Sequence, residues 1–190
     1  MKRICVYCGS NTGAQPEYLE SAKALGTLLA QGNIDVVYGG AEVGLMGAVA
    51  SAALAEGGNV IGIIPKSFAD KVCHTKLSEL QIVPTMHDRK TRMFDLSDAF
   101  ITLPGGIGTL EETFEILTWA QIGFHSKPCG LLNINGYFDS IIEFLDHSLR
   151  QQFVRQEHRD MVLVDNNPQG LLHQFENYQA PTIRKWIEKN

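Results

Sequence analysis

Short apolar runs alternate with longer segments of helical periodicity along most of this chain. Each run is bounded by glycine, proline or polar residues, which is typical of a buried strand. The predicted strands run from Arg3 to Cys8, Val36 to Tyr38, Val60 to Ile64, Leu80 to Val83, Ala99 to Leu103, Gly130 to Ile134 and Met161 to Val164.

The intervening segments predict helices, because their apolar residues recur every three or four positions. These helices are expected from Pro16 to Gly32, up to Ala55, from Met86 to Leu96, Leu110 to Gln121, Tyr137 to Leu149 and Pro168 to Asn177. The segment from Lys66 to Ser78 has no clean period and is predicted to be a loop with at most one helical turn, and a candidate lid. The C-terminal tail is expected to pack outside the core.

This alternation predicts a doubly wound, Rossmann-like α/β fold, with a parallel sheet covered by helices on both faces. A chain of 190 residues with 44% hydrophobic residues is expected to form a single domain over 1–190. Ligands of such folds bind at the carboxyl ends of the strands, where the strand order reverses.

Three glycines in four residues, Gly105, Gly106 and Gly108, separate the strand that ends at Leu103 from the helix that follows. Glycines let backbone N–H groups turn toward one point, and the helix adds its partly positive N-terminus there. The stretch therefore predicts an anion site suited to a phosphate. The alternative is a plain strand-to-helix turn.

Two other glycine-rich turns, after Cys8 and after Tyr38, also leave the carboxyl ends of predicted strands, so all three can converge on one pocket. Neither common phosphate motif fits. A P-loop is excluded because the chain has no Gly-Lys pair, and a dinucleotide fingerprint would require glycine where Glu111 stands.

Composition narrows the classes of partner. The net charge is −5 and no run of basic residues occurs, which argues against polymeric nucleic acid. No apolar stretch approaches the roughly 20 residues needed to cross a bilayer, so a cytoplasmic protein without membrane contact is expected. Cys5 and Cys8 lie on opposite faces of one predicted strand and read as buried thiols, and the histidines lack metal-ligand spacing. We expect no metal and no cofactor.

Two residues are candidates for chemistry. Arg89 falls on the apolar stripe of its predicted helix, where an arginine kept for function should burden folding. The alternative is an arginine whose stem crosses the core and returns to water. Glu112 shares a side of its helix with Ile116 and Trp119, and a carboxylate among apolar groups near a phosphate site is a candidate base or ribose ligand.

The stretch from Pro104 to Glu112 resembles the PGGxGTxxE signature of the LOG family, the cytokinin riboside 5′-monophosphate phosphoribohydrolases. The chain is also similar to that family at Cys8-Gly9-Ser10, at Tyr38-Gly39-Gly40 with Gly44 to Gly47, and from Met86 to Lys90. The similarity extends to about Arg159.

The resemblance implies hydrolysis of the N-glycosidic bond of an adenosine 5′-monophosphate, N6-modified or plain, which releases a cytokinin or adenine and ribose 5-phosphate. It places the catalytic pair at Arg89 and Glu112. Together with the glycine-rich turns, it predicts substrate-binding positions at Gly9, Ser10, Gly39, Gly40, Gly44, Met46, Lys90, Gly105, Gly106, Ile107, Gly108, Thr109, Leu110, Glu111 and Thr118.

Two rival functions stay open at this stage. A nucleotide sensor or carrier would need the anion site but no turnover. The label lysine decarboxylase, often attached to this family, would require pyridoxal phosphate on a lysine, and the chain lacks the His-Lys dipeptide usual in such enzymes.

A homodimer is also expected, with the site close to the interface. Leu110, Phe114 and Leu117 are predicted to face the sheet, which leaves Ile116 and Trp119 on the other side of the helix in need of a cover. The family resemblance indicates a second subunit there; the alternative cover is the chain's own C-terminal segment.

Overall fold

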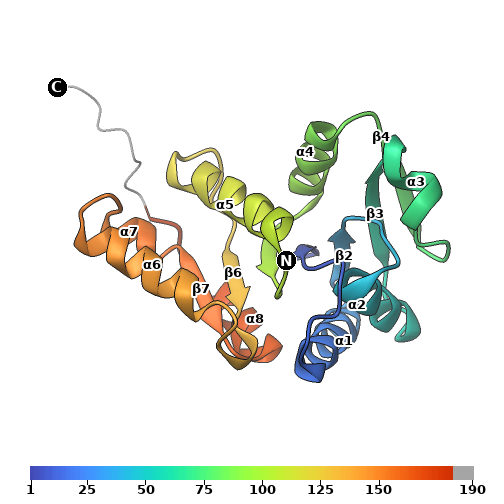
Figure 1. Cartoon of the computed structure of the whole chain (residues 1–190), viewed down its shortest axis with the longest axis horizontal. Coiled ribbons are helices and arrows are strands. Elements are labelled where there is room, and N and C mark those ends of the chain that lie inside the picture. Colours follow the sequence, from blue (N-terminus) through green and yellow to red (C-terminus); the bar gives the residue numbers. More distant parts are fainter. Residues whose placement is uncertain (182–190) are drawn as a thin grey trace.

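The computed structural model describes residues 1–181, except the side chain of Val72, and a seven-stranded parallel sheet runs through it (Figure 1). The strands are β1 (Arg3–Tyr7), β2 (Asp35–Tyr38), β3 (Val60–Pro65), β4 (Glu79–Val83), β5 (Ala99–Thr102), β6 (Cys129–Leu132) and β7 (Val162–Asp165). Their spatial order is β4-β3-β2-β1-β5-β6-β7, and every neighbouring pair is parallel.

Helices cover both faces of the sheet (Figure 1). One face carries α1 (Pro16–Gln31), α2 (Gly44–Ala55) and α8 (Pro168–Glu176); the other carries α4 (Met86–Leu96), α5 (Ile107–Gln121) and α6 (Asp139–Arg150). The short elements are α3 (Lys66–Val72), the 3-10 turn η1 (Ile134–Gly136) and α7 (Gln156–Arg159). The predicted doubly wound α/β fold is confirmed.

Alternate residues of the central strands supply the two cores. Cys5 of β1 packs under α4 and α5, whereas Cys8 just beyond its end packs under α1 and α2, as their spacing predicted. Both thiols are buried and unpaired. Central strands buried on both faces explain the nearly continuous apolar runs.

The strand order reverses between β1 and β5. The chain builds outward from β1 to β4 on one side, then crosses back to β5 and builds outward to β7 on the other. The loops that follow β1 and β5 therefore diverge and leave a crevice at the carboxyl edge of the sheet. No helix among residues 1–181 has the length and apolar character needed to cross a membrane.

The predicted boundaries are mostly right within one or two residues, with three differences. The segment expected to be a loop from Lys66 contains the seven-residue helix α3, and α7 was not predicted. Helix α5 begins at Ile107 rather than Leu110. The expected position of the last residues, 182–190, falls outside the described part of the chain.

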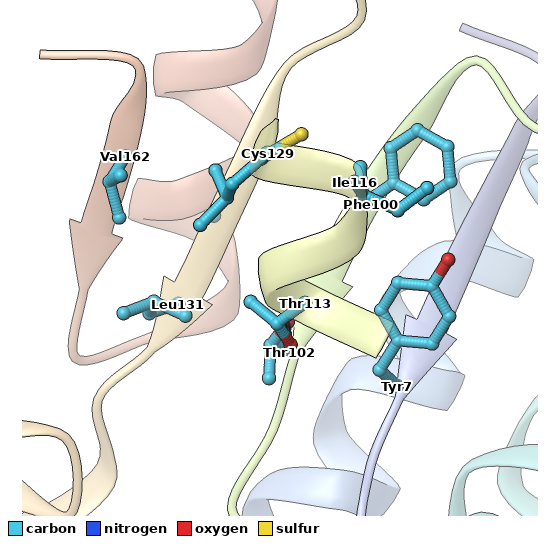
Figure 2. Close-up of a pocket in the computed structure, with 10 residues that line it drawn as sticks. Tyr7, Phe100, Thr102, Thr113, Ile116, Cys129, Leu131 and Val162 are labelled. Atoms are coloured by element: carbon cyan, nitrogen blue, oxygen red, sulfur yellow. Dashed lines mark hydrogen bonds between the residues drawn. The ribbon is translucent and has the colours of Figure 1, made fainter. Parts of the chain in front are cut away.

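Helix α5 also turns a different face to the sheet. Thr109, Thr113, Ile116 and Ala120 are its buried residues, and Figure 2 shows Thr113 and Ile116 directed at the strand side chains Thr102 and Phe100. The buried stripe is thus the one that carries the two threonines, and the prediction that Leu110, Phe114 and Leu117 face the sheet is wrong in the main. Leu117 does pack against the core that contains Phe100 and Cys129.

A threonine can occupy the buried face of α5 because its hydroxyl forms hydrogen bonds with a strand threonine and with the helix backbone. Thr113 Oγ1 donates to the Thr109 carbonyl at 2.7 Å and lies 2.8 Å from Thr102 Oγ1, so polar residues pack there without an unpaired group. Only about 10 Å³ of empty space remains among these residues. Leu110 and Leu117 pack in the cluster that α6 forms with Leu131 of β6 and Val162 of β7.

Candidate active site

A cleft of about 340 Å³ opens at the carboxyl edge of the sheet, where the strand order reverses. Four parts of the chain line it: Val6 to Ser10, Gly39 with Met46, Met86 with Arg89, and Gly106 to Thr109 with Glu112. A second hollow of about 390 Å³ adjoins it, shares Gly9, Ser10 and Gly106, and extends to Tyr18 and Tyr137.

Backbone hydrogen bonds tie the glycine-rich turns together. The Gly9 N–H donates to the Pro104 carbonyl at 3.0 Å, and the Leu45 N–H donates to the Gly9 carbonyl at 3.1 Å. The turns after β1, β2 and β5 therefore meet at one place, as the sequence predicted.

Two of these glycines are needed because the chains approach so closely. Gly44 has a φ of +58°, and a Cβ there would overlap the backbone of Ser10 and Asn11. A Cβ on Gly39 would overlap the guanidinium of Arg89. Gly39 thus makes the space in which Arg89 reaches the cleft.

The first turn of α5 presents unbonded N–H groups to the cleft. Gly106 is the N-cap residue and has no side-chain cap, and the first helical hydrogen bond runs from Leu110 N–H to the Gly106 carbonyl at 3.1 Å. Within residues 1–181, no protein acceptor takes the N–H of Gly106, Ile107, Gly108 or Thr109. Four such donors at a helix N-terminus suit an anion.

Arg89 extends from α4 into the floor of the cleft. The helix starts at a capping box, in which Thr85 and Asp88 exchange hydrogen bonds of 3.1 and 3.2 Å. Arg89 is only 8% exposed, its Nε donates to the Ile63 carbonyl at 3.2 Å, and its Nη1 forms an ion pair with Glu112 Oε1. It does not return to water, so the alternative of an arginine that merely crosses the core is wrong.

Glu112 faces Arg89 from the second turn of α5, with 11% of its side chain exposed. Burial raises the pKa of the Glu112 carboxyl above its ordinary value, and the charge and hydrogen bond of Arg89 only partly oppose this shift. The pair is thus a carboxylate of increased basicity held in place by a fixed cation, which suits a general base.

Lys90 forms a clasp between α4 and α5 at the back of this pair. Its Nζ contacts Glu111 Oε1 at 2.5 Å and Glu115 Oε1 at 3.0 Å. Burial lowers the pKa of Lys90, but the hydrogen bonds to the two carboxylates outweigh it and hold the pKa above its ordinary value. The clasp fixes the spacing of the helices that carry Arg89 and Glu112.

Most of the predicted site residues come together. Those that line the cleft are Gly9, Ser10, Gly39, Met46, Arg89, Gly106, Ile107, Gly108, Thr109 and Glu112, and Gly105 lines the adjoining hollow. Neither hollow is lined by Gly40, Gly44, Lys90, Leu110, Glu111 or Thr118. Gly40 and Gly44 act through the backbone of the turn, and Thr118 lies exposed further along α5.

Sequence reasoning missed Tyr137 in the adjoining hollow and four residues that line the cleft, namely Val6, Tyr7, Cys8 and Met86. The four cleft residues lie within three positions of Gly9 or Arg89, so their proximity in the sequence was a usable signal. Tyr137 had no such signal, because only the pairing of β5 with β6 brings it near Gly105.

Comparison with known proteins gives a consistent relationship. A family model described as "possible lysine decarboxylase" matches residues 46–175, which is more than half of the chain. The chain is 45% identical over 179 residues to a cytokinin riboside 5′-monophosphate phosphoribohydrolase of Arabidopsis thaliana, covering 94% of this chain and 82% of that protein. It is 43% identical over 173 residues to a protein of the same name from Rhodococcoides fascians, covering 90% and 87%.

Solved structures share the fold at much lower identity. The molybdenum cofactor binding protein of Rippkaea orientalis superposes with a TM-score of 0.70 at 23% identity, over 93% of this chain and 97% of that chain. DNA processing protein A of Streptococcus pneumoniae gives a TM-score of 0.57 at 15% identity, over 92% and 62%. These likenesses concern the fold alone.

Both of these relatives are covered over more than two thirds of their length, and both have the name of the family whose signature the stretch from Pro104 to Glu112 resembles. The chain therefore belongs to the LOG family of cytokinin riboside 5′-monophosphate phosphoribohydrolases.

Proposed function

We propose that this protein hydrolyses the N-glycosidic bond of adenosine 5′-monophosphates, including N6-modified ones, and releases the free base and ribose 5-phosphate. The observation that carries the proposal is the buried Arg89–Glu112 pair beside the unbonded N–H groups at the start of α5. The names of the relatives support the same reaction.

The N–H groups from Gly106 to Thr109 bind the 5′-phosphate in this proposal. A Cβ at Gly106 or Gly108 would meet no atom within 4 Å, so both glycines border open space that a phosphate can enter. Binding energy gained at the phosphate orients the ribose toward Glu112, which makes a nucleoside without phosphate a poor substrate.

Hydrolysis breaks the bond between ribose C1′ and the base nitrogen while a water oxygen bonds to C1′. Bond cleavage develops positive charge on the ribosyl group, which the Glu112 carboxylate stabilises while it accepts a proton from the attacking water. The departing base takes up one proton at a ring nitrogen and Glu112 releases the proton that it gained from water, so one water is consumed and the charge balances. Arg89 keeps the Glu112 carboxylate in position and balances its negative charge through the ion pair.

The description attached to the family model fits the cleft poorly. Lysine decarboxylation with pyridoxal phosphate needs a lysine amine free to form a Schiff base. Among the described residues, no lysine lines the cleft, and the Lys90 amine contacts both Glu111 and Glu115.

The proposal is tested by incubating the protein with AMP, with N6-isopentenyladenosine 5′-monophosphate and with adenosine, followed by chromatography for free base. Both nucleotides should release base, and adenosine should release much less. The variant Glu112→Gln, prepared in parallel, controls for contaminating hydrolases. Calorimetric binding of AMP by the parent without any release of base would identify a nucleotide sensor or carrier instead.

We further propose a homodimer, with support that differs from the initial expectation. Ile116 is 2% exposed and Trp119 packs on Phe94 at 5.2 Å between ring centroids, so the chain itself covers both residues. The outer face of α5 instead carries Ile107, which is 89% exposed, together with part-exposed Phe114. A second subunit on this face would also bring the exposed Thr118 toward a neighbouring site.

Analytical ultracentrifugation at micromolar concentration tests the dimer. The parent should sediment as a dimer and Phe114→Glu as a monomer, because a charge would be buried without a partner, whereas Phe114→Leu should stay dimeric. A monomeric parent would refute the dimer.

A cytoplasmic location is proposed on the free thiols of Cys5, Cys8, Cys73 and Cys129, which suit a reducing compartment.

A further inference from the structure

Tyr137 makes a hydrogen bond to the backbone before α5 that has no role in the hydrolysis proposed above. Its hydroxyl donates a hydrogen bond of 2.7 Å to the carbonyl of Gly105, the residue immediately before the N-cap of α5. The contact joins residues 32 positions apart in the chain, at the rim of the hollow that adjoins the cleft.

The turn that carries Tyr137 is rigidly built. It follows β6 and contains two consecutive left-handed residues, Asn135 at φ +50° and Gly136 at φ +73°. Asn133 Oδ1 accepts the Phe138 N–H at 2.7 Å, and Phe138 is completely buried. The Tyr137 ring also packs edge-on against Tyr18, with centroids 5.5 Å apart. It packs edge-on against Phe138 as well, and these two ring contacts direct the hydroxyl at Gly105 although Tyr137 is 41% exposed.

The geometry of the Gly105–Gly106 peptide links the position of the Tyr137 hydroxyl to the direction of the Gly106 N–H. In a trans peptide the C=O and the following N–H point in opposite directions, and residues 1–181 contain no cis peptide. Tyr137 lies after β6, and β5 stands between β6 and β1. Tyr137 lines the adjoining hollow and not the cleft. A Gly105 carbonyl directed at Tyr137 therefore directs the Gly106 N–H away from Tyr137, toward the cleft. Gly106 lines this cleft together with Arg89 and Glu112.

We propose that Tyr137 is a positioning residue that fixes the Gly105–Gly106 peptide so that its N–H faces the bound phosphate; this role rests on the function proposed above. Two successive glycines have no Cβ to restrict rotation of this peptide. The hydrogen bond from Tyr137 supplies the restriction that glycine cannot, and the donor is oriented before the ligand arrives.

The test compares Tyr137→Phe, which removes only the hydroxyl, with Tyr178→Phe, a matched change in a half-buried tyrosine beyond α8 and away from the cleft. Ribose 5-phosphate is titrated into 15N-labelled protein while the Gly106 amide resonance is followed. Tyr137→Phe should raise the dissociation constant about three- to tenfold, the range for one lost neutral hydrogen bond, and Tyr178→Phe should not. The KM for AMP should rise by the same factor.

A merely structural role would lower the melting temperature of Tyr137→Phe and leave the dissociation constant unchanged, which would overturn the proposal. A parent in which ribose 5-phosphate fails to shift the Gly106 amide would overturn it as well. Failure of the hydrolase proposal is distinguishable, because it appears as absent base release from AMP while the binding difference between the two variants persists.

Discussion

Glu112 is the side chain on which the proposed chemistry depends most directly. In Glu112→Gln the amide oxygen still accepts from Arg89, so the fold should persist, but no carboxylate remains to accept a proton. We expect kcat/KM to fall by at least about 10², the scale of a positioned base. Steady-state rates within about threefold of the parent would remove Glu112 from the mechanism.

The raised pKa of Glu112 gives this prediction a pH dependence. The carboxyl acts as a base only when ionised, so kcat/KM should fall as the pH drops through a pKa above the value of about 4.3 for an unperturbed glutamate side chain. The residual activity of Glu112→Gln should lack this acid limb. An identical limb in both proteins would assign the titration to another group.

Arg89 should matter for stability as well as for activity. The burden expected from an arginine on an apolar stripe is offset by its bonds to Ile63 and Glu112. Arg89→Ala leaves a buried carboxylate unpaired, and losses of about 3–5 kcal/mol are typical of such a change. We therefore expect both inactivity and a lower melting temperature.

The double variant Arg89→Met, Glu112→Gln provides the control for this explanation. It removes both charges, so most of the melting temperature should return while activity stays absent. A double variant as unstable as Arg89→Ala would show that packing, rather than the uncompensated charge, causes the loss.

The candidate site was largely predictable at this scale because its residues follow strand ends directly. Gly9, Gly39 and Gly106 each come within a few positions of a predicted strand, and parallel strands bring such positions to one edge. Lys90 shows what this reasoning cannot predict. Its place beside Arg89 in the sequence does not reveal that its amine contacts Glu111 and Glu115, behind the Arg89–Glu112 pair, instead of lining the cleft.

Among the elements, the N-terminus of α5 makes the sharpest prediction. Gly106 has a φ of −89° and a Cβ there would meet nothing within 4 Å, so Gly106→Ala should fold normally. The added methyl group projects into space proposed for the phosphate and should weaken ribose 5-phosphate binding by about tenfold or more, equivalent to about 1.4 kcal/mol. Calorimetry measures this loss.

Gly32→Ala is the matched control for that experiment. Gly32 has a φ of −80° at the end of α1, and a Cβ there would make only ordinary contacts of 3.4 to 3.5 Å. Binding equal to that of the parent is expected. If Gly106→Ala also binds as the parent does, the phosphate site lies elsewhere.

The rotation of α5 shows why element existence was easier to predict than orientation. Apolar periodicity selected Leu110, Phe114 and Leu117, but α6 packs against two of these positions and competes with the sheet for them. Thr113 can pack against the sheet because its hydroxyl forms hydrogen bonds with Thr102 and with the Thr109 carbonyl. A one-dimensional pattern contains neither the second helix nor the hydrogen-bond partner.

For the whole molecule, alternation of strands and helices was enough to predict the doubly wound sheet. The helices α3 and α7, of seven and four residues, are too short to show a clear period and escaped prediction. The homodimer stays a prediction. Its original support failed because Phe94, the ring that packs on Trp119, comes from α4, which no local pattern reveals.

Since the turns after β1, β2 and β5 gather at the carboxyl edge of the sheet, the amino edge is free for engineering. Gly57 lies there, exposed between α2 and β3, and a Cβ on it would meet nothing within 4 Å. A flexible peptide spliced in after Gly57 should cost about 0.6 kcal/mol per doubling of loop length and leave catalytic rates unchanged. This connection is thus a tethering point for immobilising the enzyme with its cleft facing away from the support.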